Sequence, residues 1–201
     1  MKGFKTMFGV ALLAGLLAVG PLQAAGEDGA QAVVAQTIDE VIAAIQDNRA
    51  ALEADPDALL GIVDEILLPR VDFDRMSRLT LGRYWNRASA DERARFQAQY
   101  RKLLVRTYAG PLSSVGDQQI DILGVRDGTG PDDVMVRSEV RDGVESIPVD
   151  YRMHRDDDGW KAYDVVIDGI SLINNYRGSF GQTIQREGMA GLIRQLEERN
   201  Q

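Results

Sequence analysis

The sequence contains no cysteine and a single histidine, His154. No disulfide can form, so the folded chain must draw its stability from its hydrophobic core. A zinc or iron site needs several histidine, cysteine or carboxylate ligands at fixed spacing, and this chain supplies few of them. A catalytic triad would have to use His154, and neither a G-x-S-x-G motif nor a glycine-rich phosphate motif is present. We therefore expect no metal, no cofactor and no enzyme activity.

Basic residues are too few for a protein that binds nucleic acid. The chain has 23 lysines and arginines against 31 aspartates and glutamates, which gives a formal net charge of -8. The phosphates of DNA or RNA attract the opposite sign of charge, and an anionic bilayer surface repels this one. The composition predicts no nucleic-acid partner.

A long hydrophobic run is found only near the start of the chain. Two lysines precede a mostly apolar stretch at residues 7–19, and a Gly-Pro pair and two alanines follow it. This order is typical of a cleavable secretory signal, and the stretch is short for a membrane span. We predict a signal peptide at residues 1–24 and one exported, soluble domain at residues 25–201.

The next part of the chain has the 3.6-residue periodicity of amphipathic helices. Apolar residues form one stripe at residues 30–49, and a second helix is expected between Pro56 and Pro69. A short helix is predicted at residues 72–81. A capping box at Ser89 begins a longer helix to about residue 108, which a Gly-Pro pair closes.

The periodicity then changes to the alternation of strands. Apolar residues alternate with polar ones at residues 120–125, 134–140, 147–153 and 163–167. The three connecting segments each contain Asp-Gly, which favours tight hairpin turns. Four strands joined by three hairpins predict an antiparallel meander. Residues 169–199 return to helix, with a break expected at Gly188.

Three aspartates, Asp156, Asp157 and Asp158, follow His154 closely and raise the question of a metal or acid-base site. We interpret the group as the tip of the third hairpin, because polar residues and Gly159 suit a tight turn. A weak calcium site is the alternative, but the EF-hand pattern is absent.

Three stretches carry a resemblance to a known family. They are LLPRVDFDRMSRLTLGRYW at residues 67–85, SADERARFQAQYRKLLVRTYA at residues 89–109 and WKAYDVVIDGISLINNYRGSF at residues 160–180. Together they resemble the MlaC family of periplasmic phospholipid-binding proteins of Gram-negative bacteria, also known as toluene-tolerance or organic-solvent-tolerance auxiliary proteins. The similarity covers nearly all of the chain after the predicted signal peptide.

The resemblance implies an α+β fold, akin to the NTF2-like and cystatin-like architectures. A helical layer would pack on a curved four-stranded antiparallel sheet and enclose an apolar cavity. The cavity would take the acyl chains of a diacyl glycerophospholipid and leave the headgroup in water. We expect a monomer.

The resemblance also implies a function and partners. A member of this family shuttles phospholipid through the periplasm between outer- and inner-membrane complexes and so maintains outer-membrane lipid asymmetry. Its partners would be an inner-membrane ABC transporter complex with an MCE-domain subunit and an outer-membrane lipoprotein-porin complex. The carrier itself hydrolyses nothing.

Residues for the cavity wall follow from periodicity on the third and fourth strands and the helix after them. For each of them ordinary core packing is the alternative role. The predicted lipid-binding residues are Ile147, Val149, Tyr151, Tyr163, Val165, Ile167, Leu172, Ile173 and Tyr176.

Two other functions compete with this one. An NTF2-like enzyme of the isomerase type would need an interior Asp and Tyr, and Asp164 beside Tyr163 is the nearest pair. Adjacent strand residues point to opposite faces, so both can enter one cavity only at a bulge. The other competitor is a periplasmic interaction module without a ligand, in which all apolar surface is core.

Overall fold

The computed structural model describes residues 24–55, 58–113 and 118–201 of the chain. Residues 1–23 of the predicted signal peptide and the predicted helix start at Pro56 lie outside this part. Within the described part, no helix is both long and apolar enough to cross a membrane.

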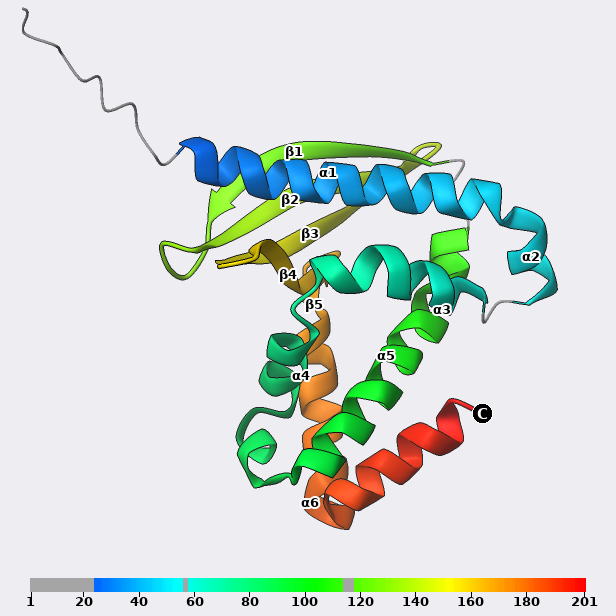
Figure 1. Cartoon of the computed structure of the whole chain (residues 1–201), viewed down its shortest axis with the longest axis vertical. Coiled ribbons are helices and arrows are strands. Elements are labelled where there is room, and N and C mark those ends of the chain that lie inside the picture. The colour runs from blue at the N-terminus through cyan, green and yellow to red at the C-terminus, as the bar shows by residue number, and fades with distance from the viewer. Residues whose placement is uncertain (1–23, 56–57, 114–117) are drawn as a thin grey trace, which may run out of the picture.

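Helices pack against an open antiparallel sheet. In Figure 1 helix α1 runs along the sheet, whereas the later helices gather in a body below it. The helices are α1 (Ala24–Asp47), α2 (Arg49–Ala54), α3 (Leu59–Ile62), α4 (Phe73–Leu81), α5 (Ala90–Ser113) and α6 (Leu172–Arg199), with a π turn at Val63–Leu67 and 3₁₀ helices at Leu68–Arg70 and Gly82–Arg87. The predicted α+β class is confirmed.

Side-chain caps fix the helix starts that the sequence predicted. The Asp72 carboxylate accepts a hydrogen bond from the Arg75 amide at 2.8 Å and begins α4. Ser89 and Glu92 exchange hydrogen bonds with each other's backbone amides, as a capping box requires. The predicted end of this helix before the Gly-Pro pair is wrong, because α5 continues to Ser113. A proline so close to the end removes only one of the last helical hydrogen bonds.

The sheet has five strands, not the four that were predicted. They are β1 (Gln119–Asp127), β2 (Asp133–Asp142), β3 (Glu145–Asp156), β4 (Gly159–Ile167) and β5 (Ile170–Ser171), and they pair in chain order. Asp168 and Gly169 both have positive φ angles, and this tight turn returns the chain so that Ile170 pairs with Ile167. Asp168-Gly169 is a fourth Asp-Gly hairpin signal, so the predicted helix start at residue 169 is wrong and α6 begins at Leu172.

Two irregularities interrupt the sheet. The β1–β2 register shifts between Ile122 and Gly124. The β3–β4 register shifts after Arg152, which pairs with Asp164, while the next residue of β3 pairs with Ala162. Beyond β4, Val71 forms a parallel bridge to Ala162.

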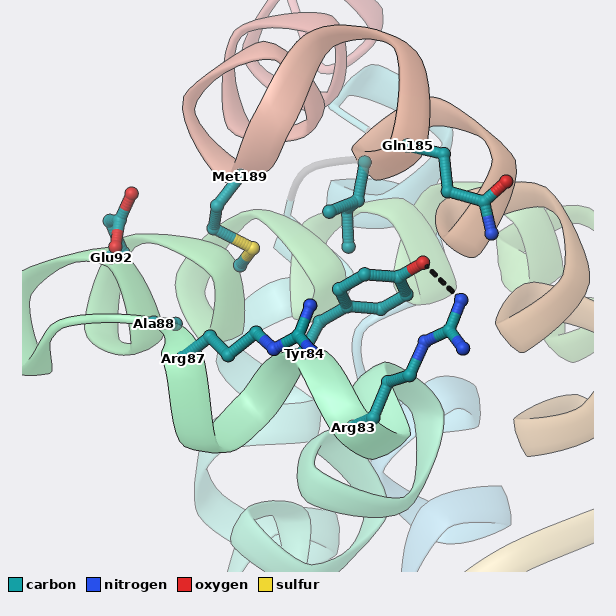
Figure 2. Close-up of a pocket in the computed structure, with 8 residues that line it drawn as sticks. Arg83, Tyr84, Arg87, Ala88, Glu92, Gln185 and Met189 are labelled. Atoms are coloured by element: carbon teal, nitrogen blue, oxygen red, sulfur yellow. Dashed lines mark hydrogen bonds between the residues drawn. The ribbon is translucent and has the colours of Figure 1, made fainter.

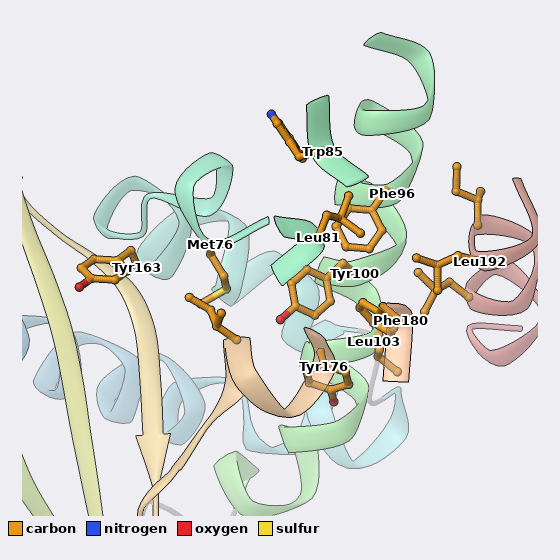
Figure 3. Close-up of a cluster of buried hydrophobic side chains, with 13 residues drawn as sticks. Met76, Leu81, Trp85, Phe96, Tyr100, Leu103, Tyr163, Tyr176, Phe180 and Leu192 are labelled. Atoms are coloured by element: carbon orange, nitrogen blue, oxygen red, sulfur yellow. The ribbon is translucent and has the colours of Figure 1, made fainter. Parts of the chain in front are cut away.

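Buried side chains form three clusters. A helical core joins α4, α5 and α6, and Figure 3 shows its aromatic rings. The Phe96 and Tyr100 rings stack with centroids 5.3 Å apart, and Phe180 meets both rings edge-on. A second cluster joins the end of α1 to α3 and α5, and a third joins the start of α1 to the sheet. The largest core therefore lies among helices and not against the sheet.

Helix α6 is kinked at Gly188, as predicted. This residue has φ 72° and ψ -179°, which is not helical. The kink turns the last three helical turns back over α5, where Leu192, Ile193 and Leu196 join the helical core. The predicted enclosed cavity stays a prediction.

Candidate functional site

Five of the residues predicted to bind lipid lie on one face of the sheet. Strand pairing sets Val149 opposite Ile167 and Tyr151 opposite Val165. Ile147 precedes Val149 by two positions on β3. Paired residues on neighbouring strands, and alternate residues along a strand, point to the same side of a sheet. We call Ile147, Val149, Tyr151, Val165 and Ile167 the apolar sheet face.

Helix α1 covers only one end of the apolar sheet face. Val136, which pairs with Tyr151, is fully buried in the cluster that Ala30 and Val34 of α1 share with the sheet. Coverage falls toward the other end, where Ile147 is 44% exposed. The other members of the face are half-buried. Apolar side chains thus remain partly accessible on the side of the sheet where α1 packs.

The Tyr151 hydroxyl is the polar atom on this face. It shares a hydrogen bond with Ser138, whose own hydroxyl donates to the Val149 carbonyl oxygen at 2.5 Å. Burial raises the pKa of the Tyr151 phenol, and the hydrogen bond with Ser138 only partly opposes this shift. The phenol is therefore neutral at physiological pH, and the face carries no charge.

The remaining predicted lipid-binding residues lie elsewhere. Tyr163, Ile173 and Tyr176 belong to the helical core, and Leu172 is buried at the start of α6. They pack with other protein side chains and do not share the apolar sheet face. Their contact with lipid stays a prediction.

Six half-buried residues that the sequence did not select pack on the same cluster as the sheet face. They are Val33 and Ile38 of α1, Ile122 and Val125 of β1, and Trp160 and Ala162 of β4. Periodicity already placed the first two on an apolar helix stripe. Nothing in a single sequence says which surface a stripe faces, so they could not be assigned to the site.

Asp164 and Tyr163 are both buried, because β4 contains the kind of bulge that our argument required for this. The register shift leaves Tyr163 as an extra residue in β4, so both side chains point into protein. The Asp164 carboxylate, however, accepts hydrogen bonds from the Ser171 hydroxyl at 2.6 Å and the Ile173 amide at 3.1 Å. The Arg75 guanidinium lies 4.3 Å from the centre of the Tyr163 ring. Both side chains are thus engaged in holding the start of α6 and in packing α4.

His154 is not at the hairpin tip where it was predicted. It lies within β3, paired with Asp133 and Lys161, and its Nδ1 atom is 3.3 Å from an Asp133 carboxylate oxygen. The turn itself consists of Asp157 and Asp158. The interpretation as a turn is thus confirmed for Asp157 and Asp158, whereas Asp156 is the last residue of β3. Among the described residues, no group of three or more potential ligands could hold a metal ion.

Lys161 neutralises much of the charge beside this turn. Its ammonium lies 3.3 Å from the Asp156 carboxylate and 3.1 Å from that of Asp158. The hydrogen bonds that the ammonium donates to Asp158 and Asp156 raise the pKa of Lys161. The triplet thus forms a local ion-pair network across the hairpin.

Comparisons with known proteins agree with this architecture. The model of a family described as MlaC protein matches residues 35–198. The intermembrane phospholipid transport system binding protein MlaC of Haemophilus influenzae is 25% identical, over 87% of this chain and 84% of its own length. A toluene tolerance protein of Pseudomonas putida is also 25% identical, over 86% of this chain and 81% of its own length.

A solved structure is similar over most of its length. It is the phospholipid-binding protein from Ralstonia solanacearum, in complex with a phospholipid. The two chains are 35% identical, with a TM-score of 0.80, and the match covers 85% of this chain and 96% of the other.

Proposed function

Because this chain belongs to the MlaC protein family, we propose that it is a phospholipid carrier whose apolar sheet face contacts the acyl chains. The observation that carries this proposal is the uncharged apolar sheet face, which is half-buried at four positions and exposed at Ile147 because α1 covers only one end of it. A core residue is normally covered on all sides, whereas this face has room for a further apolar body. The phospholipid bound to the similar Ralstonia protein supports this assignment.

The free-energy cost of exposing acyl chains to water requires an apolar binding site. Each methylene exposed to water costs about 0.8 kcal/mol, so two chains of roughly fifteen methylenes cost on the order of 24 kcal/mol. One polar contact with a headgroup contributes only about 1 kcal/mol. Acyl burial therefore dominates binding, and the carrier is tolerant of the headgroup.

The chain works in the periplasm in this proposal. The word intermembrane in the name of the Haemophilus relative supports a place between two membranes, as does the predicted signal at residues 1–24. Its partners are an inner-membrane ABC transporter complex with an MCE-domain subunit and an outer-membrane lipoprotein-porin complex. Residues 25–201 form the single binding domain.

The chain transports its ligand without chemical change. Asp164, the nearest candidate for an acid-base group, has its oxygens occupied by Ser171 and the Ile173 amide. A general base must reach the proton it abstracts. No observation on the described residues therefore favours the isomerase alternative.

Lipid analysis tests the proposal directly. Protein purified from a Gram-negative host is extracted with organic solvent, and the extract is compared with that of an unrelated exported protein. We expect a stoichiometric amount of phospholipid, with phosphatidylethanolamine and phosphatidylglycerol in roughly membrane proportion. An extract no richer than the control would instead support an interaction module without a ligand.

A further inference from the structure

A hollowed surface lies at the end of the helical body away from the sheet. Two adjoining hollows, with volumes of about 520 and 660 Å³, share Arg83, Tyr84 and Gln185. Their walls come from the end of α4, the 3₁₀ helix Gly82–Arg87 and α6. Figure 2 shows Tyr84 on the floor between two arginines. We call this surface the arginine groove.

The charge of the arginine groove is opposite to that of the chain. Arg78, Arg83, Arg87 and Arg177 line it, and Glu92 is the acidic residue among its lining residues. The chain as a whole has a net charge of -8. A basic hollow on an acidic protein focuses a local positive potential that attracts anionic groups.

Three of these arginines have no carboxylate partner in the part of the chain that the structure describes. Arg83 donates a hydrogen bond to the Tyr84 hydroxyl at 2.9 Å, and Arg177 donates two to the Leu79 carbonyl oxygen. Arg87 points along the groove beside Tyr84 (Figure 2). The hydrogen bond from Arg83 lowers the pKa of the Tyr84 phenol, which agrees with a positive environment. By contrast, Arg78 is neutralised by Asp74.

Packing and hydrogen bonds hold the backbone beneath the arginine groove in place. Trp85, next to Tyr84 in the 3₁₀ helix, is buried in the helical core. Its carbonyl oxygen accepts a hydrogen bond from Arg93 Nε at 2.9 Å, which ties the 3₁₀ helix to α5. Tyr84 lies against Gly181 of α6, where an added Cβ atom would be 3.8 Å from the ring. The arginines therefore extend from a preformed surface.

We propose that the arginine groove docks an extended, acidic segment of a partner protein. Carboxylates of such a segment would pair with Arg83, Arg87 and Arg177, while apolar side chains would rest on Leu79 and Met189. An anionic membrane fits less well, because the negative charge of the whole chain repels it. Acyl chains fit poorly, because an open groove walled by arginines leaves their methylenes wet.

This inference goes beyond lipid carriage. The groove and the apolar sheet face lie on different parts of the molecule, so a partner can hold the carrier while lipid enters or leaves. Loss of docking and loss of lipid are therefore separable.

A labelled peptide that alternates glutamate with leucine serves as the probe. Binding is measured by fluorescence anisotropy, and the amide signals that shift in ¹⁵N-labelled protein show where the peptide lies. We expect shifts at Gly181 and Gln185 and none on β3. Arg83→Gln with Arg87→Gln should weaken binding about tenfold. Raising salt from about 0.05 to 0.3 M should weaken it as well.

The matched control is Arg126→Gln with Arg199→Gln, which removes the same charge from exposed positions elsewhere. It should leave peptide affinity within about twofold of the parent. Equal weakening by both pairs, or no preference over a lysine-leucine peptide, would overturn the proposal. So would phosphatidylglycerol vesicles that bind through Arg83 and Arg87 when the peptide does not. Co-purified lipid should be unchanged in both pairs, which keeps this test independent of the carrier function.

Discussion

Asp164 has no exposed surface although it carries a carboxylate. It receives hydrogen bonds from Ser171 and from the Ile173 amide, and Arg152 Nη1 lies 3.5 Å from it. Ser171 in turn caps α6 by accepting from the Asn174 amide at 3.1 Å. One buried acid thus anchors the longest helix to the sheet.

Replacing this acid should destabilise the fold strongly. Asp164→Ala leaves the Ser171 hydroxyl and the Ile173 amide unpaired in the interior, so the free energy of unfolding should fall by about 3 kcal/mol. Urea denaturation followed by circular dichroism measures the change. Asp157→Asn, at the exposed turn, is the control and should shift stability by less than about 0.5 kcal/mol. Equal free energies of unfolding for the two variants would show that the hydrogen bonds of Asp164 do not stabilise the fold.

Buried tyrosines make stability depend on alkaline pH. Burial raises the pKa of Tyr100 in the helical core, and an unfolded tyrosine titrates near about 10. The native state therefore holds its proton more tightly. This contribution is complete below about pH 10 and is lost as pH rises further. Burial raises the pKa values of Tyr151 and Tyr163 also, so they add to the same loss.

Tyr100→Phe should therefore flatten the decline of stability above about pH 10. Denaturant unfolding at several pH values between about 8 and 11 gives the slope. Tyr84→Phe is the control, since the pKa of Tyr84 is lowered and not raised. A slope in Tyr100→Phe as steep as in the parent would contradict the assignment.

At the scale of single elements, glycine has opposite effects at two positions of α6. Gly188 adopts a positive φ at the kink, whereas Gly178 is helical and exposed, with nothing within 4 Å of an added Cβ atom. Gly188→Ala should cost about 1–3 kcal/mol because alanine is strained there. Gly178→Ala should stabilise by about 0.5–1 kcal/mol. Thermal unfolding gives the direction in which each variant shifts the midpoint. The prediction is wrong if both variants shift it in the same direction.

Local patterns predicted most elements correctly because their causes are local. The caps at Asp72 and Ser89 and the kink at Gly188 depend on neighbours within a few positions. The fifth strand was missed because Asp168-Gly169 precedes a strong helix pattern that concealed it. The bulge beside Tyr163 was missed because a register depends on the partner strand. Likewise, strand alternation grouped Val149 with Val165, but the burial of Tyr176 in a separate helical core depends on tertiary packing.

Over the whole molecule, the helical core and the apolar sheet face are separate. Phe96, Tyr100 and Phe180 stabilise the helices without contribution from the apolar sheet face. A carrier must remain folded when it is empty as well as when it is loaded. Placing the main core away from the proposed lipid-binding surface satisfies that requirement.

Charge on the sheet face should therefore empty the carrier more readily than it unfolds it. Val149→Asp or Val165→Asp places a carboxylate against acyl chains, so bound lipid should be lost. An empty site admits water, which softens the cost of the charge, and a folded lipid-free protein should remain. Lipid content and thermal unfolding are measured on the same samples.

Met135→Asp is the matched control. Met135 is also half-buried, but it lies on the opposite face of the sheet, where it pairs with Arg126 and Arg152. It should keep its lipid. If both valine variants unfold without any folded, lipid-free species, these residues are ordinary core and the sheet face is not the binding surface.

The irregular edge strands of the sheet also affect aggregation between molecules. At one edge of the sheet, a bulge beside Gly124 divides β1 into two short runs. At the other edge, β4 is hydrogen-bonded to β5 at one end and bridged by Val71 at the other. Long, straight edge strands with free amides and carbonyls act as templates on which a second chain adds as a further strand. This protein offers only short, interrupted stretches. An emptied molecule with its apolar face uncovered is thereby protected from edge-to-edge aggregation.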